Sequence, residues 1–141
     1  MTQLPVNWLT EGLLDFEYKK YILDDKILSG YHMSQAPPYF VNSELSFKPE
    51  FLKGFRVSVE WQAMGGYHTD AQNTARYKGF NIVNVRTGYQ FNTMEVWVNC
   101  LNAGDVVYAT TVEKSSWGTT YRPGQLRTFN IGIGWRLNQN K

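Results

Sequence analysis

The chain has 141 residues, which suits one domain or one piece of a larger protein. Its formal net charge of +2, without any run of Lys and Arg, gives no argument for nucleic-acid binding. The single cysteine, Cys100, excludes an internal disulfide, and no apolar stretch reaches the roughly 18 residues of a transmembrane helix. Nine Tyr, eight Phe and five Trp among many glycines favour β-structure over helix.

Six segments of the chain alternate between apolar and polar side chains, which is the pattern of a β-strand with one set of residues on each face. In chain order, we predict strands at residues 12–19, 39–48, 55–64, 80–91, 94–102 and 127–137. The last is the most regular, because Phe129, Ile131, Ile133, Trp135 and Leu137 alternate with small or polar residues. No helical period competes over any long window, so the sequence predicts an all-β antiparallel meander of about six strands.

The connections between these strands alternate between long and short. The short ones are the turn 49–54 and the two-residue link Asn92–Thr93, and the long ones are 20–38, 65–79 and 103–126. Successive connections of a meander lie at opposite ends of the sheet, so all three long loops are expected at one end. Soluble hairpin proteins have no reason to separate loop lengths so strictly.

The two faces of the predicted sheet differ in chemistry. Ionised groups fall on the polar face: Asp15, Glu17, Glu44, Arg56, Glu60, Arg86, Glu95 and Arg136. The apolar face carries aromatic residues at the end of the sheet where the short turns lie: Phe47, Phe55, Tyr89, Phe91 and Trp135. A charged face suits a water-filled lumen, and rings at that height resemble the girdle that lies at lipid headgroups. We therefore predict the wall of a transmembrane β-barrel, with its apolar face toward lipid.

Six strands are too few to close such a barrel. The smallest single-chain membrane barrels have about eight strands, and each open edge would leave backbone N–H and C=O groups unpaired in hydrocarbon. Either several copies of the chain pair with one another, or the chain is the C-terminal part of a larger barrel. The second interpretation is the simpler one.

Motifs spread over residues 30–137 resemble the C-terminal barrel wall of TonB-dependent outer-membrane receptors. The matching pieces are Gly30-Tyr31-His32-Met33 with Ala36-Pro37, NSELSFKP at 42–49, Asp70 with Asn73-Thr74, Tyr77 and Gly79, Asn84 to Tyr89, Val98 to Asn102 with Tyr108-Ala109, and Tyr121-x-Pro123-Gly124 with Arg127-Thr128-Phe129. Each piece is weak alone, but together their order and spacing are specific.

The resemblance implies a receptor of about 22 strands around a globular plug. Such a receptor takes up a scarce nutrient, most often a ferric siderophore, across the outer membrane, and the TonB complex acts on it through the plug. The present chain shows no signal peptide, TonB box or plug domain, so residues 1–141 are expected to be a C-terminal fragment that does not transport alone. Its expected partners are outer-membrane lipid, the missing plug and barrel strands, and the ligand.

Ligand contacts are expected from aromatic and basic residues of the long loops. The candidates are Tyr67, His68, Tyr108, Trp117 and Tyr121, which could hold an iron–siderophore complex by stacking and charge. A second interfacial girdle with loop packing explains the same rings without a ligand. We expect no catalytic residue, cofactor or metal: His32 and His68 lack a third ligand at a fixed spacing, and Cys100 reads as a small apolar side chain.

Two other classes of protein remain open at this point. A small soluble β-barrel that binds a ligand would turn the same apolar face inward as its core. A small porin would close one wall from several copies of the chain. Solubility without detergent would favour the first, and conducting oligomers in detergent would favour the second.

Overall fold

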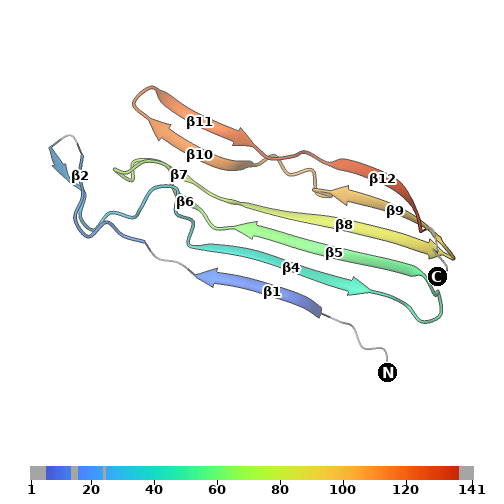
Figure 1. Cartoon of the computed structure of the whole chain (residues 1–141). Helices are drawn as coiled ribbons and strands as arrows, with labels where there is room; N and C mark the ends of the chain where they lie inside the picture. The colour runs from blue at the N-terminus through green and yellow to red at the C-terminus, as the bar shows by residue number, and fades with distance from the viewer. Residues whose placement is uncertain (1–5, 14–15, 24, 137–141) are drawn as a thin grey trace.

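A computed structural model describes residues 6–13, 16–23 and 25–136, and its main element is one antiparallel sheet of six strands (Figure 1). The strands are β1 (Val6–Leu13), β4 (Tyr39–Phe47), β5 (Phe55–Met64), β8 (Phe80–Phe91), β9 (Met94–Leu101) and β12 (Thr128–Trp135). They lie side by side in chain order, which is the predicted meander. The described residues contain no helix, and hence none with the length and apolarity to cross a membrane. The predicted all-β antiparallel fold is confirmed.

The first strand lies earlier in the chain than predicted. β1 ends at Leu13, so it shares only two residues with the predicted segment 12–19. Residues 14–15 of that segment lie outside the described residues, and the rest of it leaves the sheet: Glu17 forms an isolated bridge with His32. Alternation shows that a segment is extended, but it does not show which neighbour it pairs with, and pairing with β4 is what defines β1.

Each of the three long connections contains a two-stranded sheet of its own. These sheets pair β2 (Ile22–Leu23) with β3 (Lys26–Ile27), β6 (Tyr67–His68) with β7 (Arg76–Tyr77), and β10 (Ala109–Ser115) with β11 (Gly118–Pro123). The long hairpin β10–β11 corrects the expectation that residues 103–126 form only a loop. All three small sheets lie at one end of the main sheet, opposite the short turns (Figure 1).

The strand register separates apolar from polar side chains across β4, β5, β8, β9 and β12. One row of cross-strand neighbours consists of Leu45, Val59, Val85, Cys100 and Phe129. The adjacent row, one residue along each strand and therefore on the other face, consists of Ser46, Ser58, Arg86, Asn99 and Asn130. The predicted division into an apolar and a polar face thus holds through five consecutive strands.

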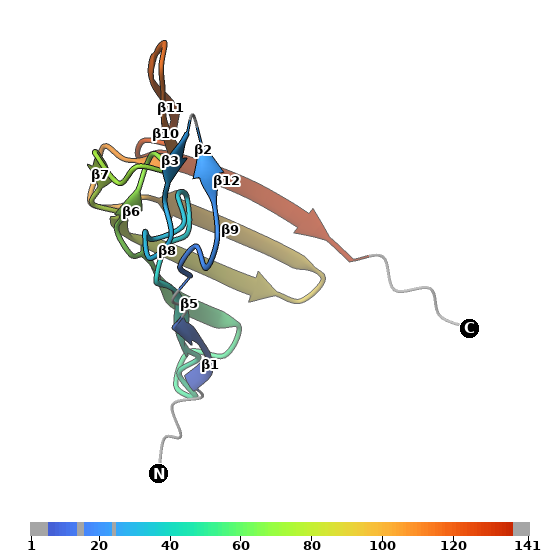
Figure 2. The same ribbon diagram turned by 90° about the vertical axis from the view of Figure 1, so that its left-hand side faces the viewer.

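The apolar face is the more exposed of the two. Ile131 and Ile133 on β12 are 72% and 71% exposed, whereas Glu60 and Asn84 on the polar face are 9% and 5% exposed. Seen from the side, the six strands form a single curved layer with β1 and β12 at its two edges (Figure 2). Among the described residues, no second layer covers the apolar side chains.

The buried apolar residues gather at the loop end of the sheet. They are Leu28, Ala63, Met64, Tyr67, Ile82, Ala109 and Val112. They come from the last residues of β5, the first residues of β8, and the long connections that carry the small sheets. The loops therefore pack against each other and against the end of the main sheet.

Candidate functional site

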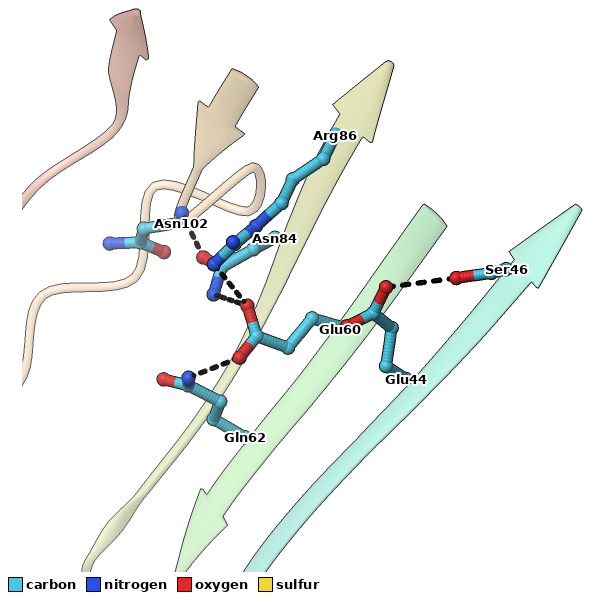
Figure 3. Close-up of polar contacts among 7 residues, drawn as sticks. All are labelled: Glu44, Ser46, Glu60, Gln62, Asn84, Arg86 and Asn102. Atoms are coloured by element: carbon cyan, nitrogen blue, oxygen red, sulfur yellow. Dashed lines mark hydrogen bonds and ion pairs between the residues drawn. The ribbon is translucent and has the colours of Figure 1, made fainter. Parts of the chain in front are cut away.

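A hydrogen-bonded carboxylate lies at the centre of the polar face (Figure 3). Glu60 on β5 accepts hydrogen bonds from the side-chain amides of Gln62 at 2.8 Å and Asn84 at 3.0 Å, and it forms an ion pair with Arg86 at 2.8 Å. Its cross-strand neighbour Glu44 accepts a hydrogen bond from Ser46 at 2.9 Å. The polar groups of this face therefore satisfy one another in spite of partial burial, as a polar lining requires.

A polar cleft of about 500 Å³ lies next to this cluster on the same face. Its charged and aromatic lining residues are Glu44, Lys48, Arg56, Arg86 and Trp97. Arg56 also pairs with Glu95 across the sheet. This surface carries both signs of charge and few large apolar groups, so it is suited to contact with water or with another polar segment.

Asn102 joins the polar face to the longest loop. It is 2% exposed, and its backbone N–H donates to Asn84 Oδ1 at 2.8 Å. Its side-chain amide accepts from Val106 N at 2.9 Å and donates to the carbonyl oxygens of Val106 and Gln125, at 2.9 and 3.0 Å. The side chain of Asn102 therefore ties both ends of the connection between β9 and β12 together. Its backbone N–H joins them to the sheet at Asn84 (Figure 3).

Two tyrosine hydroxyls hold the inner edge of the β10–β11 hairpin. Tyr67 accepts from Val112 N at 2.7 Å and lies 3.3 Å from Val112 O. Tyr77 accepts from Ala109 N at 3.1 Å and donates to Ala109 O at 2.9 Å. The two rings meet edge to face at 5.6 Å. The hydroxyls thus take the place of a neighbouring strand for the backbone of β10.

Replacing Tyr77 with Phe is expected to lower the free energy of unfolding by about 1–2 kcal/mol, because the N–H and C=O of the buried Ala109 each lose a partner. Urea unfolding of the chain in detergent micelles measures this. The matched control is Tyr121→Phe, whose ring is 63% exposed and whose loss of a hydroxyl should cost almost nothing. Equal stabilities for the two variants would contradict this role of Tyr77.

Asp70 organises the tight loop between β6 and β7. Its carboxylate accepts hydrogen bonds from Thr74 Oγ1 at 2.8 Å, Thr74 N at 3.2 Å and Ala75 N at 3.0 Å. Partial burial opposes ionisation, but these bonds and the positive charge of Lys114 outweigh it and lower the pKa of Asp70 below its ordinary value. The Asp-x-x-Asn-Thr motif is therefore explained by loop structure.

The lowered pKa of Asp70 makes the loop sensitive to acid. The charged form stabilises the fold above the ordinary pKa of an aspartate, and this contribution is lost as the pH falls through the lower pKa of the folded state. We expect the amide resonances of Thr74 and Ala75, followed by NMR from about pH 6 to about pH 2, to move together with that titration. Asp70→Asn should remove the titration, and persistence of the same pH dependence in this variant would exclude Asp70 as its source.

The five predicted ligand-binding residues all lie at the loop end, but the structure does not gather them in one place. Tyr67 is buried, and its hydroxyl is engaged with Val112. The ring of Tyr108 contacts Phe80 at 4.7 Å and lies so close to Gly124 that a Cβ there would be 2.2 Å from it. Trp117 and Tyr121 are 97% and 63% exposed on the hairpin.

His68 is the remaining candidate, and the structure places it beside His32. The two imidazole rings are nearly parallel, with their centroids 5.6 Å apart. Sequence reasoning treated the two histidines as independent loop residues, because nothing in the spacing of the segments shows that they meet. Among the described residues, no group of three or more His, Cys, Asp or Glu side chains has the arrangement of a metal site.

No family model matches the chain. The sheet and its loops do match solved structures. The siderophore receptor PiuA from Acinetobacter baumannii superposes with a TM-score of 0.68 at 14% identity, over 82% of this chain and 17% of that one. The ferric yersiniabactin uptake receptor FyuA from Yersinia pestis gives a TM-score of 0.61 at 16% identity, over 81% of this chain and 18% of that one.

The chain therefore has the fold of a segment of these receptors, and it spans less than a fifth of the length of either. At this identity the likeness concerns the fold alone. The siderophore-receptor-like fold that the sequence motifs predicted is confirmed.

Proposed function

We propose that the chain is the C-terminal barrel-wall segment of a TonB-dependent receptor in the outer membrane. The likeness of fold to two receptors, one for siderophores and one for ferric yersiniabactin uptake, supports this proposal, as do the motifs between Gly30 and Phe129. The intact receptor would import a ferric siderophore or a similar nutrient. The segment itself would supply a lipid-facing surface, a polar lumen and external loops, and it would catalyse no reaction.

The observation that carries the proposal is the inverted exposure of the two faces. Large apolar side chains on β12 and its neighbours are open, whereas Glu60, Asn84 and Asn102 are buried and hydrogen-bonded. Removing one such apolar side chain from water is worth about 1.5–3 kcal/mol. Several apolar side chains are exposed on this face, so contact with lipid would stabilise it by several times this free energy. Water would remain on the polar side.

The open edges of the sheet explain why other strands are needed. Within the described residues, β1 pairs only with β4 and β12 pairs only with β9. The outer edges of both strands would leave N–H and C=O groups unpaired in hydrocarbon, at several kcal/mol for each group. In our proposal, the remaining barrel strands pair with these edges and the plug packs against the polar cleft. The TonB complex reaches the receptor only through that plug, so this segment alone would not transport.

Ligand binding is proposed for the exposed aromatic residues of the β10–β11 hairpin. Trp117 in the turn and Tyr121 on β11 are exposed. The basic residues Lys114 and Arg122 lie on β10 and β11. Stacking and positive charge suit an iron–siderophore complex. Tyr67 and Tyr108 would support this surface from below, since the structure engages both in packing.

Two neighbouring residues of β12 provide the test of orientation. Ile131→Arg places a charge on the apolar face, and Asn130→Arg places the same charge on the polar face. Both positions are exposed in the described structure. We expect Ile131→Arg to destabilise the membrane-inserted chain by about 2–4 kcal/mol and Asn130→Arg to have little effect. Urea titration of the chain refolded with phospholipid vesicles, and flotation with those vesicles, measure both.

Other outcomes would replace the proposal. If the chain is monodisperse without detergent and the two arginine variants behave alike, the soluble binding module is the better interpretation. If detergent-solubilised chains cross-link into oligomers that conduct ions, the small porin is the better interpretation. Energy-dependent import by cells expressing only these 141 residues would show that the segment is transport-competent on its own.

A further inference from the structure

Another polar cleft lies among the three long connections, which gather at one end of the main sheet (Figure 1). Its volume is about 490 Å³, within the range of about 300–1,000 Å³ that ligand pockets occupy. Each connection contributes to the lining, with Gln35 from the first, Gln72 from the second and Ser115 from the third. We call it the loop cleft.

Hydrogen bonds between the connections hold the walls of the loop cleft in place. Lys114 N donates to Thr69 O at 2.9 Å, and Lys114 Nζ donates to Thr74 Oγ1 at 2.7 Å. Gln35 N donates to His68 O at 2.9 Å, which joins the first connection to the second. The cleft is therefore formed before any ligand binds, and this lowers the entropic cost of binding.

The charges in the loop cleft do not favour an anion. Its ionised lining residues are two carboxylates, Asp70 and Glu113, and one ammonium, Lys114. The ammonium donates to Thr74 Oγ1, which in turn donates to Asp70, so the positive charge is already engaged. An anionic ligand would meet both carboxylates, and Lys114 is the one cation among the described lining residues.

The neutral lining consists mainly of groups that both donate and accept hydrogen bonds. Five lining residues carry hydroxyls and two carry primary amides, whereas Leu23 and Ala71 are the apolar ones. Thr69 in the wall is 3% exposed, and its buried Oγ1 has no hydrogen-bond partner among the described residues. A buried hydroxyl without a partner is costly. The ligand that matches this lining is uncharged and carries several hydroxyl groups of its own.

An open aromatic ring lies next to the loop cleft in the chain. Ser115 and Ser116 line the cleft, and Trp117 follows them in the turn between β10 and β11. Trp117 is 97% exposed, so the described residues cover almost none of its indole. The flat apolar face of an indole suits the C–H face of a sugar ring, and its N–H is a hydrogen-bond donor.

We propose that the loop cleft binds a short neutral saccharide, with its hydroxyls on the hydroxyl and amide groups of the lining and one ring stacked on Trp117. Each sugar hydroxyl both donates and accepts, and a neutral ring brings no charge to Asp70 or Glu113. The same sugar can belong to a free glycan or to a glycolipid headgroup. This site goes beyond the proposed function and does not depend on it, because the loops alone form it.

The test is saturation-transfer NMR of the full chain in dodecylphosphocholine micelles, whose headgroup contains no sugar. The probes are the methyl glycosides of glucose, galactose and mannose, with glucuronate and galacturonate as matched anions. We expect saturation transfer to at least one neutral glycoside and none to the uronates. For the sugar that binds, the octyl glycoside in the micelle is compared with the methyl glycoside in water. Tighter binding of the octyl form indicates a glycolipid headgroup, equal binding indicates a free glycan, and both support the proposal.

Substitutions locate the sugar in the loop cleft. Gln72→Ala and Trp117→Ala should each weaken binding about threefold to tenfold, the loss expected for one neutral hydrogen bond or one stacked ring. The matched controls are Gln90→Ala and Trp135→Ala, because both residues lie at the short-turn end of the main sheet and should leave binding unchanged.

Three results would overturn the proposal: no transfer to any neutral glycoside, equal transfer to the uronates, or unchanged binding in both Gln72→Ala and Trp117→Ala. None of these results would bear on membrane insertion or import, so failure here is distinguishable from failure of the proposed function.

Discussion

Asn102→Ala is expected to lower the free energy of unfolding by about 2–4 kcal/mol. The substitution removes the partners of Val106 N, Val106 O and Gln125 O, in a residue that is 2% exposed. It also places alanine at a φ of 49°, in the left-handed region that asparagine tolerates better. Urea unfolding in detergent micelles, followed by tryptophan fluorescence, measures the loss.

The control separates the hydrogen bonds from the backbone conformation. Asn92, in the turn between β8 and β9, has a φ of 51° but is exposed. Asn92→Ala should therefore cost only about 1–2 kcal/mol for the left-handed conformation. Asn102→Asp should cost at least as much as Asn102→Ala, because it loses both donated bonds and buries a carboxylate against the carbonyl oxygens of Val106 and Gln125. Equal losses for Asn102→Ala and Asn92→Ala would show that the side-chain bonds of Asn102 contribute nothing.

Gly79→Ala is expected to be among the most damaging single-methyl additions in the chain, at about 2–5 kcal/mol. Gly79 lies immediately before β8 with a φ of 81°, and a Cβ there would be 2.1 Å from the carbonyl oxygen of Met64. That oxygen belongs to the backbone, so it cannot rotate away. The same urea titration should show a reduced midpoint.

Gly30 gives a matched comparison for this prediction. Its φ of 82° is almost the same, but a Cβ there would meet nothing within 4 Å. Gly30→Ala should therefore cost only about 1–2 kcal/mol from backbone strain. The difference between the two variants measures the steric contact with Met64, and the prediction fails if Gly30→Ala is as damaging as Gly79→Ala.

The main sheet could be predicted from the sequence because it has two chemically different faces. In a strand with lipid or apolar atoms on one side and polar groups on the other, apolar and polar residues alternate along the sequence. This alternation can be recognised without a structure. The strands at 55–64 and 80–91 were predicted to the residue for this reason. The connecting turn Asn92–Thr93 followed from the end of one pattern and the start of the next.

The β10–β11 hairpin was missed because it lacks that contrast. Most of its residues are exposed on both sides, so its threonines, Lys114 and Tyr121 show no apolar period. Two other features of the sequence indicate the hairpin. Threonine pairs favour extended backbone, and Trp117-Gly118 lies where the hairpin turns. The burial of one edge of β10 also depends on Tyr67 and Tyr77, which are distant in the chain.

The candidate site was predicted only in part, and for a related reason. Exposed aromatic residues such as Trp117 can be recognised in the sequence of a loop without a structure. The contact between His32 and His68 depends on how two loops fold over the sheet edge, and no local pattern records it. The roles of Asp70, Asn73 and Asn102 were visible only as pieces of a motif, and their hydrogen bonds explain why those residue types stand there.

The chain order of the strands has a consequence for how the sheet is made. β8 and β9 are joined by two residues, so this pair closes with a small loss of chain entropy and is the natural nucleus. Each further strand then pairs with the free edge of the strand that was added before it. Contacts close in sequence lead to fast assembly, and a wall built in this order exposes at most one growing edge on each side at any moment.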